Sequence, residues 1–243
     1  MQPFSLSFSC QSVFSCACTE NDVKAVKAYN NFVRLMRAAV DGKWKEVDRL
    51  MSRTLELNYT YKNQTILMIA AREGKIDVIT KSLKRKVNIY HKDTRGLTAL
   101  TYAAQANQTK AIEMILNADA LDVTTEPLID LADLGGATPL IYAVRAGHSA
   151  AIELLLKRGA DLDIDMSVCL TAFLHNQMET LKTLLHAGAC FNEKDIRFFS
   201  DIGGILPALM QETIIDFKKK ISELVLLQLS SDTTSVVMKY FLI

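Results

Sequence analysis

The residues whose chemistry could support catalysis are two cysteine–histidine combinations in the C-terminal half of the chain. His186 and Cys190 lie four positions apart, and Cys169 lies six positions before His175. A thiolate beside an imidazole is the arrangement of a cysteine nucleophile with its general base. Gly188 should end a helix between His186 and Cys190, and a buried cysteine also behaves as a small hydrophobic residue. Ordinary packing accounts for these residues better than catalysis, so we expect no catalytic residues.

Sequence motifs for phosphate, dinucleotide or metal chemistry do not occur in the chain. GxGxxG, GxxxxGK[ST], HExxH and GxSxG are all absent from the sequence, so nothing indicates a phosphate-binding loop, a zinc-binding helix or a nucleophile elbow. Five cysteines without a CxxC pair give neither a disulfide framework nor a zinc site. We therefore expect no cofactor, no metal and no enzymatic activity. The cysteine usage favours a reducing, cytoplasmic compartment.

The composition indicates a folded protein with little net charge. Of the 243 residues, 49% are hydrophobic and 23% are charged, and the formal net charge is +1. A chain of this length buries a sizeable core, and its net charge provides no field that would hold nucleic acid or an anionic membrane. No run of about eighteen residues is apolar enough to span a bilayer. We expect another protein as the partner, no nucleic acid and no membrane span.

A basic run between residues 81 and 95 is a local departure from this balance. Such a run could meet phosphate or an acidic peptide. It lacks the aromatic interleaving of a base-stacking surface, so a solvated helix and loop is the favoured interpretation. Its residues are Lys81, Lys84, Arg85, Lys86, His91, Lys92 and Arg95.

Three segments of the chain repeat one pattern. Thr65 begins TILMIAAREGKIDVITKSL, Thr98 begins TALTYAAQANQTKAIEMIL, and Thr138 begins TPLIYAVRAGHSAAIELLL. The first two starts are 33 residues apart and the next two are 40 residues apart. Self-similarity at such a period indicates a repeat protein in which each unit stacks on its neighbours. The seven additional residues fall in the acidic stretch 121–135, where they should lengthen a turn.

Each segment predicts a pair of short helices. Threonine is a good helix N-cap because its hydroxyl accepts a hydrogen bond from an unpaired backbone N–H. Gly74, Asn107 and Gly147 follow nine residues after the three threonines, and these residue types tolerate the left-handed conformation that ends a helix. An apolar run at three- and four-residue spacing then predicts a second helix.

This pattern resembles the ankyrin repeat. The stretch TPLIYAVRAGHSAAIELLLKRGADLD, residues 138–163, is closest to the consensus, and weaker copies cover 33–58 and 167–192. The resemblance implies an all-α ankyrin-repeat solenoid of about five stacked helix-turn-helix units, with short hairpin-like turns and helical caps. It divides the chain into a disordered leader (1–29), the repeat domain (30–192), a helical C-terminal cap (193–230) and a tail (231–243).

One position departs from the family pattern throughout the chain. The consensus Thr-Pro-Leu-His start keeps its histidine in no copy, and Met68, Thr101, Ile141 and Leu170 stand in its place. We expect apolar packing to replace the hydrogen-bond network that this histidine normally provides.

The resemblance also implies a function and a site. Ankyrin repeats usually bind another protein in the concave groove formed by the turn tips and inner helices, so we expect a non-enzymatic protein–protein interaction module or scaffold. Tyrosine and arginine are frequent interface anchors, which singles out Tyr61, Arg72, Arg95 and Arg145. Transferred copy by copy, the groove positions are Tyr61, Lys62, Gln64, Arg72, Glu73, Arg95, Leu97, Gln105, Arg145, Met166 and His175.

The sequence leaves two other functions open. The first is an ankyrin-type effector of an intracellular bacterium that acts in the cytosol of a host cell, which the uncharged first 19 residues permit. The second is a cryptic cysteine-dependent enzyme in the C-terminal region, with Cys169 or Cys190 as the nucleophile. A translocation assay tests the first function, and a thiol-reactive probe tests the second.

Overall fold

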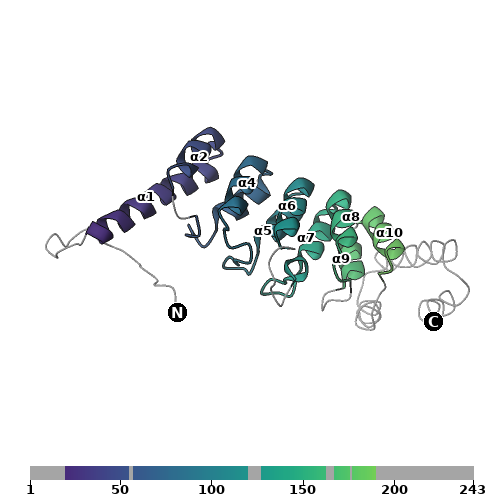
Figure 1. Ribbon diagram of the computed structural model, residues 1–243. Helices are drawn as coiled ribbons and strands as arrows, with labels where there is room; N and C mark the ends of the chain where they lie inside the picture. Colours follow the sequence, from purple (N-terminus) through teal and green to yellow (C-terminus); the bar gives the residue numbers. More distant parts are fainter. Residues whose placement is uncertain (1–19, 55–56, 120–126, 163–166, 176, 190–243) are drawn as a thin grey trace, which may run out of the picture. The chain divides into compact units, whose positions relative to one another are not determined.

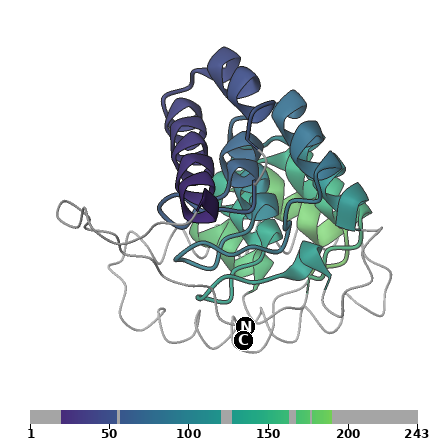
Figure 2. The same ribbon diagram turned by 60° about the vertical axis from the view of Figure 1, so that its left-hand side comes forward.

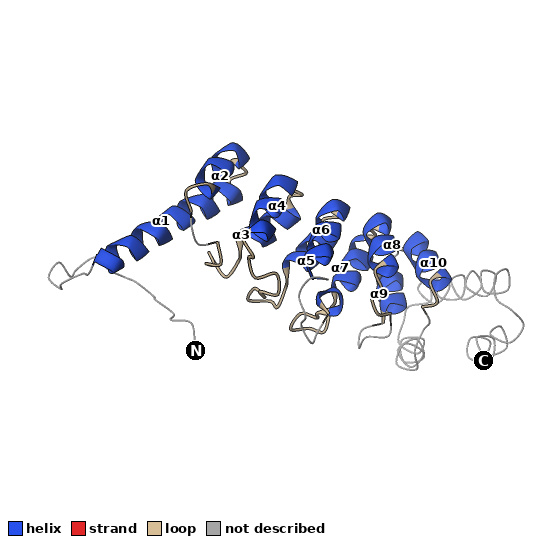
Figure 3. Cartoon of the chain, in the orientation of Figure 1, coloured by secondary structure: helices blue, strands red, loops and turns tan. Residues whose placement is uncertain are grey.

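The computed structural model describes residues 20–54, 57–119, 127–162, 167–175 and 177–189. Within these residues the chain forms ten α-helices and one short 3₁₀-helix, joined by loops and turns (Figure 3). The chain divides into two compact units, Met1–Pro139 and Leu140–Ile243, and each is described by itself. The expected cap (193–230) and tail (231–243) lie outside the described residues, as do residues 1–19 of the expected leader.

In its described residues, the first unit contains three helix pairs and a 3₁₀-helix. They are α1 (Glu20–Val40) with α2 (Trp44–Met51), α3 (Ile66–Arg72) with α4 (Ile76–Lys84), α5 (Ala99–Gln105) with α6 (Thr109–Asp119), and η1 (Leu128–Asp130). The short helices α3 and α5 pack against each other, α4 packs against α6, and α1 packs against α2 and α3 (Figures 1 and 2). We call α3 and α5 the inner helices and α2, α4 and α6 the outer helices.

Buried threonine caps begin the two inner helices. The backbone N–H of Met68 donates to Thr65 Oγ1, and that of Thr101 donates to Thr98 Oγ1, each at 3.3 Å. The six residues that follow each cap are all buried, because each inner helix lies between other helices. Helices this short are marginal alone, so tertiary packing stabilises them.

The inner helices end at the residues that the sequence indicates. Gly74 and Asn107, each one residue beyond the C-cap of α3 or α5, adopt positive φ angles of 61° and 55°. The backbone N–H of Lys75 then donates to Ala70 O at 2.9 Å, which pairs a carbonyl near the end of α3. This compact turn sends the chain into the outer helix of the same pair.

Short turns, which we call fingers, precede Thr65, Thr98 and Thr138. In the finger 61–64, the backbone groups of Tyr61 and Gln64 exchange hydrogen bonds of 2.9 and 3.1 Å. The two residues between them, Lys62 and Asn63, have φ angles of 51° and 60°. Positive φ at both central residues is the signature of a type I′ hairpin turn.

The fingers 93–97 and 133–137 are instead organised by an aspartate. Asp93 Oδ1 accepts backbone N–H donors from two residues of its own finger, each at 2.8 Å, and Asp133 Oδ1 does the same. The backbone N–H of Leu134 donates to Arg95 O at 3.1 Å and so joins these two fingers. A Cβ on Gly96 would lie 2.7 Å from Leu134 N, so this close approach requires glycine.

The described part of the second unit contains two further helix pairs. They are α7 (Pro139–Ala146) with α8 (Ser149–Lys157), and α9 (Val168–Leu174) with α10 (Met178–His186). Helix α10 packs against α9 and α8. Leu140, Ile152, Leu155 and Leu184 are fully buried and contribute to the core of this unit.

Helix α1 begins earlier than the expected domain boundary. Residues 20–29 form its first half, whereas the sequence pattern predicted a disordered leader there. In the described part of the chain, no helix has the length and apolarity to cross a membrane.

Candidate protein-binding surface

A polar cluster joins two fingers of the first unit to the inner helix α5. The Tyr102 hydroxyl donates to Asp93 Oδ2 at 2.8 Å and accepts from Gln64 Nε2 at 2.7 Å and from Arg95 Nη2 at 3.1 Å. The Arg95 guanidinium also lies over the Tyr102 ring, 6.0 Å from its centroid. We call these four residues the Tyr102 cluster.

The burial within this cluster is uneven. The Asp93 side chain is 4% exposed and its carboxylate lies 3.7 Å from Arg95 Nε, whereas the Arg95 side chain is 60% exposed. Backbone N–H groups, the Tyr102 hydroxyl and the guanidinium together satisfy the buried carboxylate, so its burial does not leave an uncompensated charge. The guanidinium of Arg95 is therefore fixed by its contacts with Tyr102 and Asp93, while much of the side chain faces solvent.

Most of the residues predicted in the first unit lie on its fingers or at the ends of its inner helices. Tyr61 is half-buried, and the Lys62 ammonium lies 5.7 Å from the centroid of its ring. Arg72 and Glu73 are exposed at the end of α3 and form an ion pair of 3.1 Å. We call this set the finger-side surface: Tyr61, Lys62, Gln64, Arg72, Glu73, Arg95 and Gln105.

One predicted contact residue is buried. Leu97 has no exposed surface, so a partner cannot reach its side chain, and the prediction for this residue was wrong. The cause is the Asp93 finger, in which the Leu97 N–H donates to the carboxylate at 2.8 Å. Gln64 occupies the equivalent position in the preceding copy and reaches Tyr102 instead.

The residues predicted in the second unit are only partly described. Arg145 is half-buried and its guanidinium lies 5.5 Å from the centroid of the Tyr142 ring. His175 is exposed just after α9, while Met166 lies outside the described residues. Cys169, one of the two conceivable nucleophiles, is fully buried.

Asp93 and Tyr102 were not predicted as site residues. A signal for both was present, because each stands at the same distance from its threonine in two copies. Asp93 and Asp133 lie five residues before Thr98 and Thr138, and Tyr102 and Tyr142 lie four residues after them. Both tyrosines lie under an arginine side chain, so the pairing of the two residue types recurs between copies.

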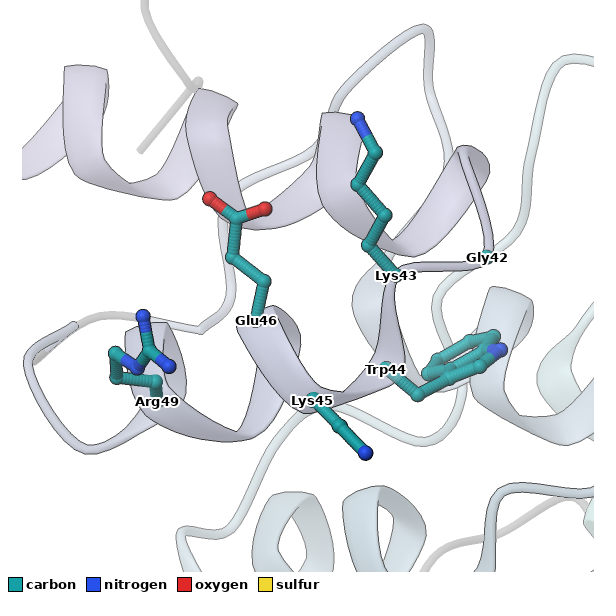
Figure 4. Close-up of a pocket in the computed structure, with 6 residues that line it drawn as sticks. All are labelled: Gly42, Lys43, Trp44, Lys45, Glu46 and Arg49. Atoms are coloured by element: carbon teal, nitrogen blue, oxygen red, sulfur yellow. The ribbon is translucent and has the colours of Figure 1, made fainter.

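A shallow hollow at the start of α2 offers less chemistry. Lys75 Nζ lies over the Trp44 ring, 5.3 Å from its centroid. A hydrogen bond and an ion pair with Asp41 raise the pKa of Lys43 above its ordinary value. Figure 4 shows the side chains spreading in different directions instead of converging on a ligand. The lining residues are Gly42, Lys43, Trp44, Lys45, Glu46 and Arg49.

Metal-binding groups do not gather in the described part of the chain, where no cluster of three or more histidine, cysteine, aspartate or glutamate side chains could hold an ion.

Comparison of the sequence with protein families agrees with the fold of paired helices. A family model described as ankyrin repeats matches residues 35–127, 88–166 and 123–195. These matches cover well over half of the chain, which therefore belongs to the ankyrin repeat family. No significant match to a curated protein is found. Ankyrin repeats are generally protein–protein interaction modules and are typically not enzymes.

Proposed function

We propose that this chain is a non-enzymatic binding module that docks a partner protein on the finger-side surface. The observation that carries the proposal is the Tyr102 cluster. Arginine and tyrosine supply large contact area at interfaces, and their contribution is greatest where the side chain is already ordered. Arg95 is ordered by Tyr102 and Asp93 before any partner arrives, so binding there would cost little side-chain entropy.

The finger-side surface is also chemically mixed, as protein interfaces usually are. It combines the half-buried ring of Tyr61 and the exposed amide of Gln105 with the cationic groups of Lys62, Arg72 and Arg95. Charged groups at the rim of an interface mainly steer association and select partners. The burial of Cys169 argues against a catalytic thiol at that position, which favours binding over the cysteine-enzyme alternative.

A quantitative affinity pull-down from the native cell tests this proposal. The test variant carries Lys62→Glu, Arg72→Glu and Arg95→Glu, and the matched control carries Arg34→Glu, Lys110→Glu and Lys157→Glu at exposed sites elsewhere. Both variants change the net charge from +1 to −5, since three reversals subtract six charges. We expect the test variant to capture about tenfold less of the specific partner protein than the wild type does. The control should capture as much as the wild type. Full retention by the test variant would contradict the proposal.

A further inference from the structure

Exposed cations gather where two neighbouring outer helices end, away from the Tyr102 cluster. One lies on α2, one lies in the turn that follows α2, and one lies on the side of α4 that faces α2. The other three lie at the C-terminal end of α4. All of them are exposed. We call this set the outer-helix basic patch: Arg49, Arg53, Lys81, Lys84, Arg85 and Lys86.

Two contacts between the helices bring these cations into one patch. Arg85 Nη1 donates to the Thr54 carbonyl oxygen, just beyond α2, at 2.7 Å. The Lys81 ammonium pairs with the Asp48 carboxylate on α2. Figure 1 shows α2 and α4 as neighbours in the first unit, so the basic ends of both helices belong to a single surface.

The positive charge of this patch exceeds what the fold requires. Cations near a helix C-terminus favourably offset the helix dipole, yet α6 ends without a basic residue in its last turn. Among the described residues, Arg49, Arg53, Lys84 and Lys86 have no ion-pair partner. The patch therefore concentrates charge in a chain whose net charge is only +1.

We propose that the outer-helix basic patch binds an acidic, Asp- and Glu-rich segment of a partner protein. Its three arginines provide planar guanidinium groups, which pair with carboxylates through two parallel hydrogen bonds. None of the large hydrophobic residues exposed in the described part of the chain belongs to the patch. It therefore has neither an aromatic platform for nucleic-acid bases nor an apolar side chain to insert into a bilayer.

Fluorescence anisotropy with a labelled octaglutamate peptide and the full chain tests this assignment. The patch variant carries Arg49→Glu, Arg53→Glu and Lys84→Glu, and the control is again Arg34→Glu, Lys110→Glu and Lys157→Glu. Both variants reach the same net charge of −5 from +1. We expect the patch variant to bind about tenfold more weakly than the control. Wild-type binding should also weaken as ionic strength rises to about 0.15 M.

The following outcomes decide whether the patch itself binds the acidic peptide. Equal weakening in both variants would overturn the proposal, because binding would then follow net charge alone. Tighter binding of double-stranded RNA or of phosphatidylserine vesicles, lost in the patch variant, would also overturn it. If the patch variant unfolds at a lower temperature, the neutral set Arg49→Gln, Arg53→Gln and Lys84→Gln replaces it and should still weaken binding about threefold.

The outcome is independent of the finger-side surface. The variant that carries Lys62→Glu, Arg72→Glu and Arg95→Glu has the same net charge as the patch variant, so it serves as another control. We expect it to bind the octaglutamate peptide as the control does. Peptide binding lost only in this variant would overturn the patch and place the acidic segment on the finger-side surface instead.

Discussion

Among single residues, Tyr102 joins three other side chains on the finger side of the first unit. Its hydroxyl donates to one buried carboxylate oxygen of Asp93 and accepts from the side chains of Gln64 and Arg95. The tyrosine is itself 3% exposed, so it does not offer contact area to a partner. Its role is to position Arg95 and to join the two fingers.

Removing this hydroxyl should therefore be costly. In Tyr102→Phe, Asp93 Oδ2 loses a hydrogen-bond donor while it stays buried, and we expect a loss of about 1–3 kcal/mol in the free energy of unfolding. Urea denaturation measures this loss. Tyr61→Phe is the control, because Tyr61 makes no side-chain hydrogen bond among the described residues, and it should change stability by less than about 0.5 kcal/mol. Equal losses in the two variants would show that the cluster does not stabilise the fold.

The Tyr102 cluster also shows where sequence reasoning ends at the residue scale. Gln64 and Tyr102 are 38 positions apart, and no local pattern relates a finger residue to a helix residue at that distance. The prediction that Leu97 lies on the surface was wrong because no local pattern indicated its burial. Its burial depends on how the Asp93 finger folds over it, which its position in the repeat does not reveal.

At the scale of elements, local signals predicted the helices well. Thr65 and Thr98 begin α3 and α5, and Gly74 and Asn107 end them, because caps and turns depend on residues close together in the sequence. The start of α1 was not predicted, since no repeat pattern extends to residues 20–29. A contact at one of the lost histidine positions was also not predicted. The Thr101 and Thr98 hydroxyls share a hydrogen bond of 3.1 Å there, so a polar interaction remains at that position.

The threonine cap of α5 gives a prediction at this scale. Thr98 is fully buried and its hydroxyl accepts from the Thr101 N–H. In Thr98→Ala that N–H loses its partner, so we expect a loss of about 1 kcal/mol in the free energy of unfolding. Chemical denaturation measures it, with Thr98→Ser as the control that retains the hydroxyl. A serine variant as unstable as the alanine variant would show that the lost methyl packing, not the cap, is responsible.

The whole molecule combines a repeat fold with surfaces that its core does not need. Stacked repeats stabilise one another through neighbouring interfaces, which leaves the fingers and helix ends free to vary. Family membership was predictable because the repeats occur in the sequence itself, and the family match over 35–195 confirms it. The partner was not predictable, because one fold serves many binding functions.

Site-specific photo-crosslinking tests the central claim, partner binding on the finger-side surface, most directly. A photoreactive phenylalanine analogue would replace either exposed Glu73, at the end of α3, or exposed Lys110, on the outer helix α6. We expect a protein adduct to form in cells from position 73 and far less of it to form from position 110. An adduct that forms equally from both positions, or only from position 110, would contradict the claim.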